Sequence, residues 1–304
     1  MKDNARIVVY ARGEGQTATT TLPSEIAFAS DGVKLHGLDW GGAVGATPMV
    51  LLHGCGSNAW TFGAVAPLLR AGLGDSYRIV AIDQRGAGDS DKPPSGYGPS
   101  DFARDVLAVQ EALGGQPMVL VGHSRGGWQA AYLAGRWPER VRQLVLIDPA
   151  RIMFATPQDA DDFYAAVRAN LGPFASPEAA IAYAREREPR ARWTPERERA
   201  FLFGFEERAD GSLVGKMPGC VVDQLRQARE ETDSVGPLLD RVSMPVLLLV
   251  ASTSDETRQQ QKLEYARRIA HARVEFLDGT HALQLDVPER VCELVVELLR
   301  TRSP

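Results

Sequence analysis

The chain has 304 residues, of which 44% are hydrophobic and 24% charged, and its formal net charge is −5 at pH 7. These values predict a globular protein with a sizeable core, arranged as one large domain that carries an insertion. The negative charge argues against nucleic acid or an anionic membrane surface as the main partner, and no apolar run approaches the roughly 20 residues that span a bilayer.

The N-terminal residues and the cysteines indicate a reducing compartment. Residues 1–6 lack the apolar core of a signal peptide, so we expect a cytoplasmic protein. The three cysteines, Cys55, Cys220 and Cys292, are odd in number and widely spaced. We therefore expect free thiols, with neither a disulfide framework nor a metal site.

Apolar runs alternate with helical patterns through the first half of the chain. After a polar N-terminal arm (residues 1–22), residues 26–40 predict a β-hairpin around a turn at 30–32. Buried strands are then predicted at 49–52, 77–82, 119–121 and 141–147, with helices at 62–70, 101–113 and 128–136. Strands that are apolar throughout and alternate with helices indicate the α/β class, with a mostly parallel, twisted sheet and helices on both faces.

The pattern changes between residues 151 and 242, where helical segments follow one another without a buried strand. Strands return at 245–251 and 274–277, and an amphipathic helix at 288–300 closes the chain. We therefore expect a core domain made of residues 1–150 and 243–304, and an inserted helical cap made of residues 151–242.

A strand, a sharp turn and a helix surround Ser124. The turn reads Gly122-His123-Ser124-Arg125-Gly126, with glycines two positions before and after the serine. Such a turn strains the serine backbone and pushes its hydroxyl out of the sheet, where the N–H of Arg125 and the helix N-terminus face a developing anion. This arrangement is typical of a nucleophilic serine, although an ordinary glycine-rich turn has the same short pattern.

Four separated motifs resemble the α/β-hydrolase superfamily over residues 26–300. They are His53-Gly54-Cys55-Gly56, the segment Asp83-Gln84-Arg85-Gly86-Ala87-Gly88-Asp89-Ser90-Asp91, the turn around Ser124, and Gly279-Thr280-His281. The resemblance implies that Ser124 is the nucleophile, His281 the general base, and the backbone N–H groups of Cys55 and Arg125 the oxyanion hole. It also implies that no cofactor is needed.

Two acids are candidates for orienting His281. Asp148 ends the strand at 141–147 and lies 24 positions after Ser124, whereas Asp255 follows the strand at 245–251. Members of the superfamily supply the acid from either position. Asp255 lacks the usual glycine-containing turn before it, so Asp148 is slightly preferred and the choice remains open.

The motifs together predict a serine hydrolase that acts on an ester or lactone of a small, mostly apolar molecule. Gly54, Trp60, Trp128 and Phe154 are the candidate substrate-binding residues, and Arg125 either favours an anionic substrate or pairs with a nearby acid. The alternatives are a hydrolase of carbon–carbon or amide bonds, a lyase or perhydrolase, and a hydrolase-like module that binds a ligand with little turnover. The oligomeric state, monomer or homodimer, is left open.

Overall fold

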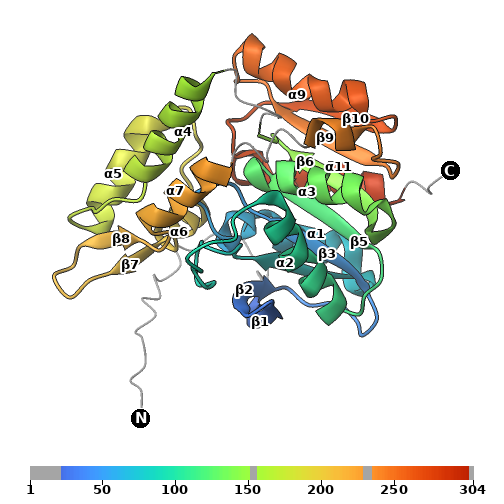
Figure 1. Cartoon of the computed structure of the whole chain (residues 1–304), viewed down its shortest axis with the longest axis horizontal. Helices are drawn as coiled ribbons and strands as arrows, with labels where there is room; N and C mark the ends of the chain where they lie inside the picture. Colours follow the sequence, from blue (N-terminus) through green and yellow to red (C-terminus); the bar gives the residue numbers. More distant parts are fainter. Residues whose placement is uncertain (1–21, 151–155, 229–234, 301–304) are drawn as a thin grey trace.

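The computed structural model describes residues 22–150, 156–228 and 235–300, and its centre is a single eight-stranded sheet (Figure 1). The strand order is β1-β2-β4-β3-β5-β6-β9-β10. The strands are β1 (Ser24–Ser30), β2 (Val33–Asp39), β3 (Thr47–Leu52), β4 (Tyr77–Ile82), β5 (Met118–His123), β6 (Val141–Ile147), β9 (Val246–Ala251) and β10 (Ala272–Leu277). Strand β2 is antiparallel to β1 and β4, and all other neighbours are parallel, which confirms the predicted fold class.

The N-terminal hairpin is confirmed in detail. Strands β1 and β2 pair from Ser24 opposite Asp39 to Ser30 opposite Val33. The two residues between them, Asp31 and Gly32, have positive φ angles of 45° and 78°. Glycine and aspartate tolerate this left-handed backbone, which the tight hairpin turn needs. Residues 1–21 of the predicted N-terminal arm lie outside the described residues.

Alternate residues of the central strands pack against opposite layers of helices. In β3, Val50 and Leu52 join one buried cluster, and Met49 and Leu51 join the other. The first cluster receives side chains from α2 (Pro99–Ala112), α3 (Arg125–Arg136), α8 (Val235–Leu239) and α9 (Glu256–Arg268). The second receives them from α1 (Val65–Leu73), α10 (Leu283–Asp286) and α11 (Pro288–Arg300). Because both faces are covered, these strands are apolar throughout, as the sequence predicted.

The segment between β6 and β9 forms an insertion that stands to one side of the sheet (Figure 1). Its elements are α4 (Pro157–Ala169), α5 (Pro177–Arg187), α6 (Pro195–Leu202), the strands β7 (Phe205–Glu207) and β8 (Leu213–Gly215), and α7 (Gly219–Gln227). The sequence had predicted helices here and missed the short antiparallel β7–β8 hairpin. The predicted boundary at residue 242 remains a prediction, although α8 already packs on the core helix α3.

Contacts from several elements hold the insertion against the core. Arg197 of α6 donates a hydrogen bond of 3.0 Å to Asp286 of α10, and both side chains are buried. The ring of Trp60 stacks on that of Phe203 with centroids 4.6 Å apart. A buried, hydrogen-bonded ion pair and a large apolar contact together give this seam a defined geometry.

Gly135 of α3 tests the close packing between α3 and α8. A Cβ atom at this position would lie 2.3 Å from the backbone oxygen of Leu238, which is far inside van der Waals contact. We expect Gly135→Ala to lower the free energy of unfolding by about 1–3 kcal/mol because the backbone must move. The matched control is Gly72→Ala in α1, where the nearest atom is a Val296 methyl group at 3.3 Å. Denaturant unfolding measures the stability of both variants. A Gly135→Ala variant as stable as Gly72→Ala would contradict the packing argument.

Candidate active site

Ser124 lies at the apex of a strained turn between β5 and α3. Its φ is 52° and its ψ is −120°, in the left-handed half of the map that non-glycine residues rarely occupy. The turn is held in place because the Ser124 N–H donates to the oxygen of Ile147 at 3.0 Å, and the N–H groups of Trp128 and Ala150 donate to the Ser124 oxygen. The backbone conformation predicted from the sequence is therefore present.

The flanking glycines are required by two backbone approaches. A Cβ at Gly122 would lie 2.3 Å from the oxygen of Gly126, and a Cβ at Gly126 would lie 2.3 Å from the oxygen of Leu52. Any side chain at either position would therefore force the start of α3 away from the ends of β3 and β5. This is the physical reason for the glycine spacing around Ser124.

His281 and Asp148 meet across the ends of three strands. The Nδ1 of His281, in the loop after β10, lies 2.5 Å from Oδ2 of Asp148, which follows β6. Asp148 is 0% exposed, and its other oxygen, Oδ1, accepts a hydrogen bond of 2.9 Å from the Ala251 N–H at the end of β9. A buried carboxylate on Nδ1 orients the imidazole and leaves Nε2 as the available ring nitrogen.

The charge state of Asp148 follows from its partners. Burial opposes ionisation, but the hydrogen bond and charge of His281, the cation of Lys262 and the Ala251 N–H outweigh burial and hold the pKa of Asp148 below its ordinary value. Asp148 is therefore a carboxylate at neutral pH. A carboxylate can stabilise a protonated imidazole, whereas a neutral acid cannot.

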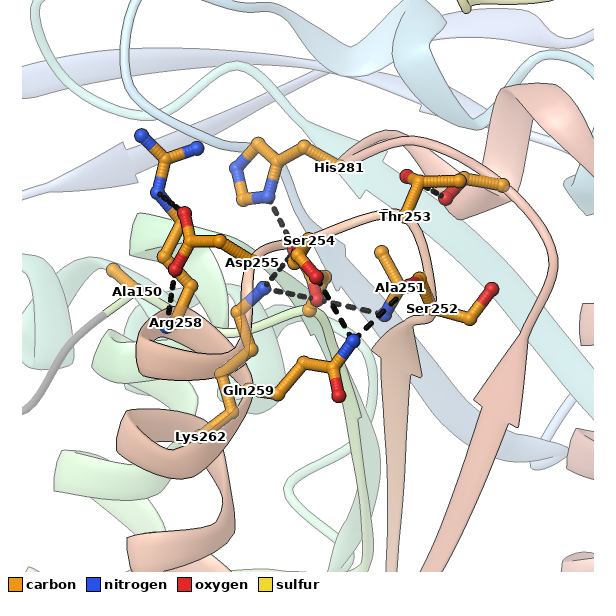
Figure 2. Close-up of polar contacts among 12 residues, drawn as sticks. Ala150, Ala251, Ser252, Thr253, Ser254, Asp255, Arg258, Gln259, Lys262 and His281 are labelled. Carbon is orange, nitrogen blue, oxygen red and sulfur yellow. Dashed lines mark hydrogen bonds and ion pairs between the residues drawn. The ribbon is translucent and has the colours of Figure 1, made fainter.

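Asp255, the other candidate acid, lies elsewhere. Its side chain caps the N-terminus of α9, where it accepts a hydrogen bond of 2.8 Å from the Arg258 N–H and pairs with the Arg258 guanidinium at 3.2 Å (Figure 2). Both side chains are exposed. An N-cap role explains the placement of Asp255 fully. The structure thus brings His281 to Asp148 and not to Asp255.

His123 contacts the loop that carries His281. Its Nε2 donates to the backbone oxygen of His281 at 2.9 Å, and the two imidazole rings have centroids 4.8 Å apart. Burial, together with the charge of His281, lowers the pKa of His123 to about 3. His123 is therefore neutral and positions the His281 backbone without competing for protons.

The His53-Gly54-Cys55-Gly56 segment lies directly against Ser124. A Cβ at Gly54 would be 3.1 Å from Cβ of Ser124, so the backbone here approaches the serine as closely as glycine allows. The Gln84 N–H donates to Nε2 of His53 at 3.0 Å, and Nδ1 of His53 donates to the Gly54 oxygen at 2.7 Å. His53 therefore braces the loop. Within the part of the chain that the structure describes, neither the Cys55 N–H nor the Arg125 N–H has a hydrogen-bond acceptor.

The three aromatic candidates for substrate binding have different outcomes. Trp60 stacks on Phe203 at the seam between core and insertion. Trp128 is buried in the core cluster beside Tyr132, so we leave it out of the proposed pocket. Phe154 lies outside the described residues.

Lys262 is a site residue that the sequence reasoning missed. It lies in α9, and its Nζ contacts Oδ1 of Asp148 at 2.5 Å and Oγ of Ser254 at 3.2 Å (Figure 2). The side chain is 9% exposed. In the sequence Lys262 belongs to a polar run typical of an exposed helix, and 114 positions separate it from Asp148. Nothing in that pattern indicated a contact.

One cluster has the composition of a metal site. His36, Asp83 and Asp89 offer ligand atoms within 4.8 Å of one another. The Asp83 oxygens, however, already accept hydrogen bonds from the Ala59 N–H at 2.7 Å and the Asp89 N–H at 2.9 Å, and Nδ1 of His36 lies at 2.8 Å. These contacts tie the loop after β4 to its neighbours, so the donor set is explained without an ion.

Comparison with known proteins identifies the family. The model of the α/β hydrolase fold matches residues 47–288, and the chain belongs to this family. Over 105 residues it is 39% identical to a 2-(acetamidomethylene)succinate hydrolase of Mesorhizobium japonicum, with 34% of this chain and 36% of the relative covered. It is 36% identical over 155 residues to a non-heme chloroperoxidase of Streptomyces lividans, with 48% and 55% covered. The chain thus spans only about a third to a half of the length of these curated relatives.

Solved structures agree over most of the chain. The crystal structure of an E-2-(acetamidomethylene)succinate hydrolase superposes with a TM-score of 0.76 at 23% identity, covering 92% of this chain and 100% of the other. An enol-lactonase from Burkholderia xenovorans LB400 gives 0.69 at 20% identity, covering 91% and 100%. At these identities the likeness shows the fold alone. Within the described ranges, no helix combines the length and apolarity that crossing a bilayer requires.

Proposed function

We propose that this protein is a serine hydrolase that cleaves an ester or lactone of a small, mostly apolar molecule. Ser124 attacks the carbonyl carbon while His281 accepts the hydroxyl proton, and Asp148 orients and stabilises the protonated imidazole. The leaving alcohol takes that proton, and water then hydrolyses the acyl-enzyme by the same steps in reverse. The observation that carries the proposal is the 2.5 Å contact between His281 and buried Asp148 beside the strained Ser124 turn.

The free backbone donors support an oxyanion hole. The N–H groups of Cys55 and Arg125 flank Ser124 and lack acceptors among the described residues. Donors preorganised around a developing oxyanion supply a large part of the rate enhancement in acyl transfer. The Ser124 hydroxyl makes no hydrogen bond within the described chain, and such catalytic contacts often tighten only when substrate binds.

The insertion supports a cap over this site. Tyr164 and Val167 of α4 form a buried cluster with Phe102 of α2, and Cys55 packs against it. The side chain of Val167 would lie 3.3 Å from a Cβ at Gly56, so α4 borders the loop that carries the proposed oxyanion donor. An apolar cover on a polar catalytic centre fits a small, mostly apolar substrate.

The relatives support hydrolysis without deciding the bond that is cleaved. The names of the succinate-derivative hydrolase and the enol-lactonase indicate small hydrolysed molecules, whereas the name of the chloroperoxidase indicates a different reaction. A ligand-binding module with little turnover is the alternative from another class. An activated Ser124 is expected of the hydrolase and is not needed by the binding module.

The first prediction concerns the nucleophile. A fluorophosphonate should phosphonylate Ser124 as the serine oxygen displaces fluoride, because this hydroxyl has a proposed base and proposed oxyanion donors beside it. Intact-mass analysis and peptide mapping make the measurement. Ser124→Ala should give no adduct and no ester turnover while its melting temperature stays close to that of the wild type. An unlabelled, folded wild-type protein would favour the binding module.

The second prediction separates the two acids. Asp148→Asn should slow ester hydrolysis and probe labelling on the order of 10³- to 10⁴-fold, because His281 loses its orienting carboxylate. Asp255→Asn should lose only part of a helix cap and remain within a few-fold of the wild-type rate. Steady-state kinetics on 4-nitrophenyl butyrate compares them. A larger loss for Asp255→Asn would contradict the assignment of Asp148.

A further inference from the structure

Among the described residues, no acidic side chain balances the charge of the Arg125 guanidinium. This guanidinium lies 4.2 Å from the ring centroid of Phe102 and acts electrostatically on Cys55 and Tyr164. Among the residues that the structure describes, no carboxylate pairs with it. Burial lowers the pKa of Arg125 from its ordinary value, yet an arginine remains charged at neutral pH.

Among the described residues, the two arginines that are more deeply buried than Arg125 are both paired. Arg85 makes two hydrogen bonds of 2.6 Å to Asp105, and Arg197 donates to Asp286 at 3.0 Å. These pairs follow the rule that a charge inside a protein is matched by a counterion. Arg125 departs from the rule, since the face of Phe102 is a weaker partner for a cation than a carboxylate is.

Neighbouring groups cannot serve as a hidden counterion. Burial raises the pKa of the Cys55 thiol, which is therefore neutral at neutral pH. The Tyr164 hydroxyl donates a hydrogen bond of 3.1 Å to the Leu225 oxygen, as a protonated phenol does. The guanidinium thus faces neutral groups of the oxyanion loop and of α4.

The position of Arg125 connects this charge to the reaction. It directly follows Ser124, and its side chain is only partly buried, so a molecule bound at the serine can reach it. We propose that the Arg125 guanidinium binds a carboxylate carried by the substrate within a few bonds of the scissile carbonyl. This inference rests on the proposed function and specifies its substrate class: esters or lactones with one anionic group on an otherwise apolar body.

The test compares anionic and neutral substrates of matched length. Mono-4-nitrophenyl glutarate and adipate carry a terminal carboxylate, and 4-nitrophenyl pentanoate and hexanoate lack it. After correction for spontaneous hydrolysis, the wild type should show a higher kcat/KM for one hemiester than for its neutral counterpart. In Arg125→Gln the ratio of the two kcat/KM values should fall at least about tenfold, because a charge-assisted contact is lost. The ratio is independent of any change common to both substrates.

Arg136→Gln is the matched control, since it removes the same charge from an exposed position on the same helix. Its ratio should equal that of the wild type, and an equal fall in both variants would show a general charge effect and overturn the proposal. Calorimetric titration with monomethyl glutarate tests binding without turnover. Binding that depends on Arg125 in a protein without esterase activity would reject the hydrolase and keep the carboxylate site. Ester turnover with no preference for the anionic substrate and no Arg125-dependent binding would keep the hydrolase and overturn the carboxylate site.

Lys262 carries a second, independent inference. Its Nζ is a buried cation that contacts Oδ1 of Asp148, whereas His281 contacts Oδ2 of the same carboxylate. We infer that Lys262 is a positioning residue that weakens the pull of Asp148 on the protonated base, so that the site becomes active at a lower pH. The charged or titratable groups around it are Asp148 after β6, His281 after β10, His123 on β5, and Asp255 and Arg258 at the start of α9.

The pH dependence of kcat/KM tests this role. In Lys262→Met, the midpoint of the acid limb should move up by at least about half a pH unit, because the full carboxylate charge then favours the protonated base. Lys262→Arg keeps the cation, so its midpoint should stay close to that of the wild type, and Lys34→Met, at an exposed position of β2, should leave the midpoint unchanged. A lower plateau rate or melting temperature without movement of the midpoint would show a merely structural lysine. If Lys262→Met does not fold, Lys262→Gln gives the same comparison.

Discussion

The buried carboxylate of Asp148 is the interaction on which the candidate site depends. It follows β6 and accepts hydrogen bonds from the end of β9, from His281 after β10 and from Lys262 on α9. A carboxylate that is 0% exposed would be costly without these partners, because desolvation opposes its charge. The same contacts that stabilise the charge also join four elements at one edge of the sheet. Any displacement of β9 or α9 would therefore move Asp148 and change the position of the His281 side chain.

The insertion is coupled to the same edge through Asp286. Its Oδ2 accepts hydrogen bonds from the backbone N–H and the hydroxyl of Thr280, the residue before His281. Its Oδ1 accepts from Arg197 of α6 and from the Arg192 N–H, both in the insertion. One buried acid thus links the loop of the proposed base to the proposed cap. Such a link makes the position of His281 depend on how the insertion sits against the core.

Two charged groups near Ser124, Asp148 and Arg125, differ in how far their partners balance the charge. Asp148 has more than one cationic or donor partner, whereas among the described residues Arg125 contacts an aromatic ring and neutral neighbours. A satisfied charge holds geometry, and an unsatisfied charge leaves free energy for a ligand of opposite sign. The mostly apolar substrate predicted from the aromatic residues and the carboxylate proposed from Arg125 are compatible if the anionic group is single.

The sequence alone determined the architecture and the location of the candidate nucleophile. Continuous apolar runs predict buried parallel strands because both faces of such a sheet are covered, and the glycines beside Ser124 report a backbone approach that excludes side chains. These are local constraints, so they leave a local pattern. The predicted motifs 53–56, 122–127 and 279–281 also meet at one edge because parallel strands all end there.

Only the tertiary structure decided which distant side chains touch. It brought His281 to Asp148 across 133 positions and gave Asp255 to a helix cap, although both acids follow a buried strand. It revealed the contact of Lys262 with Asp148, left Arg125 without an acid among the described residues, and buried Trp128 in the core. The physical reason is that hydrogen bonds and ion pairs depend on distances of a few ångströms, which residue order does not specify once the chain has folded back on itself.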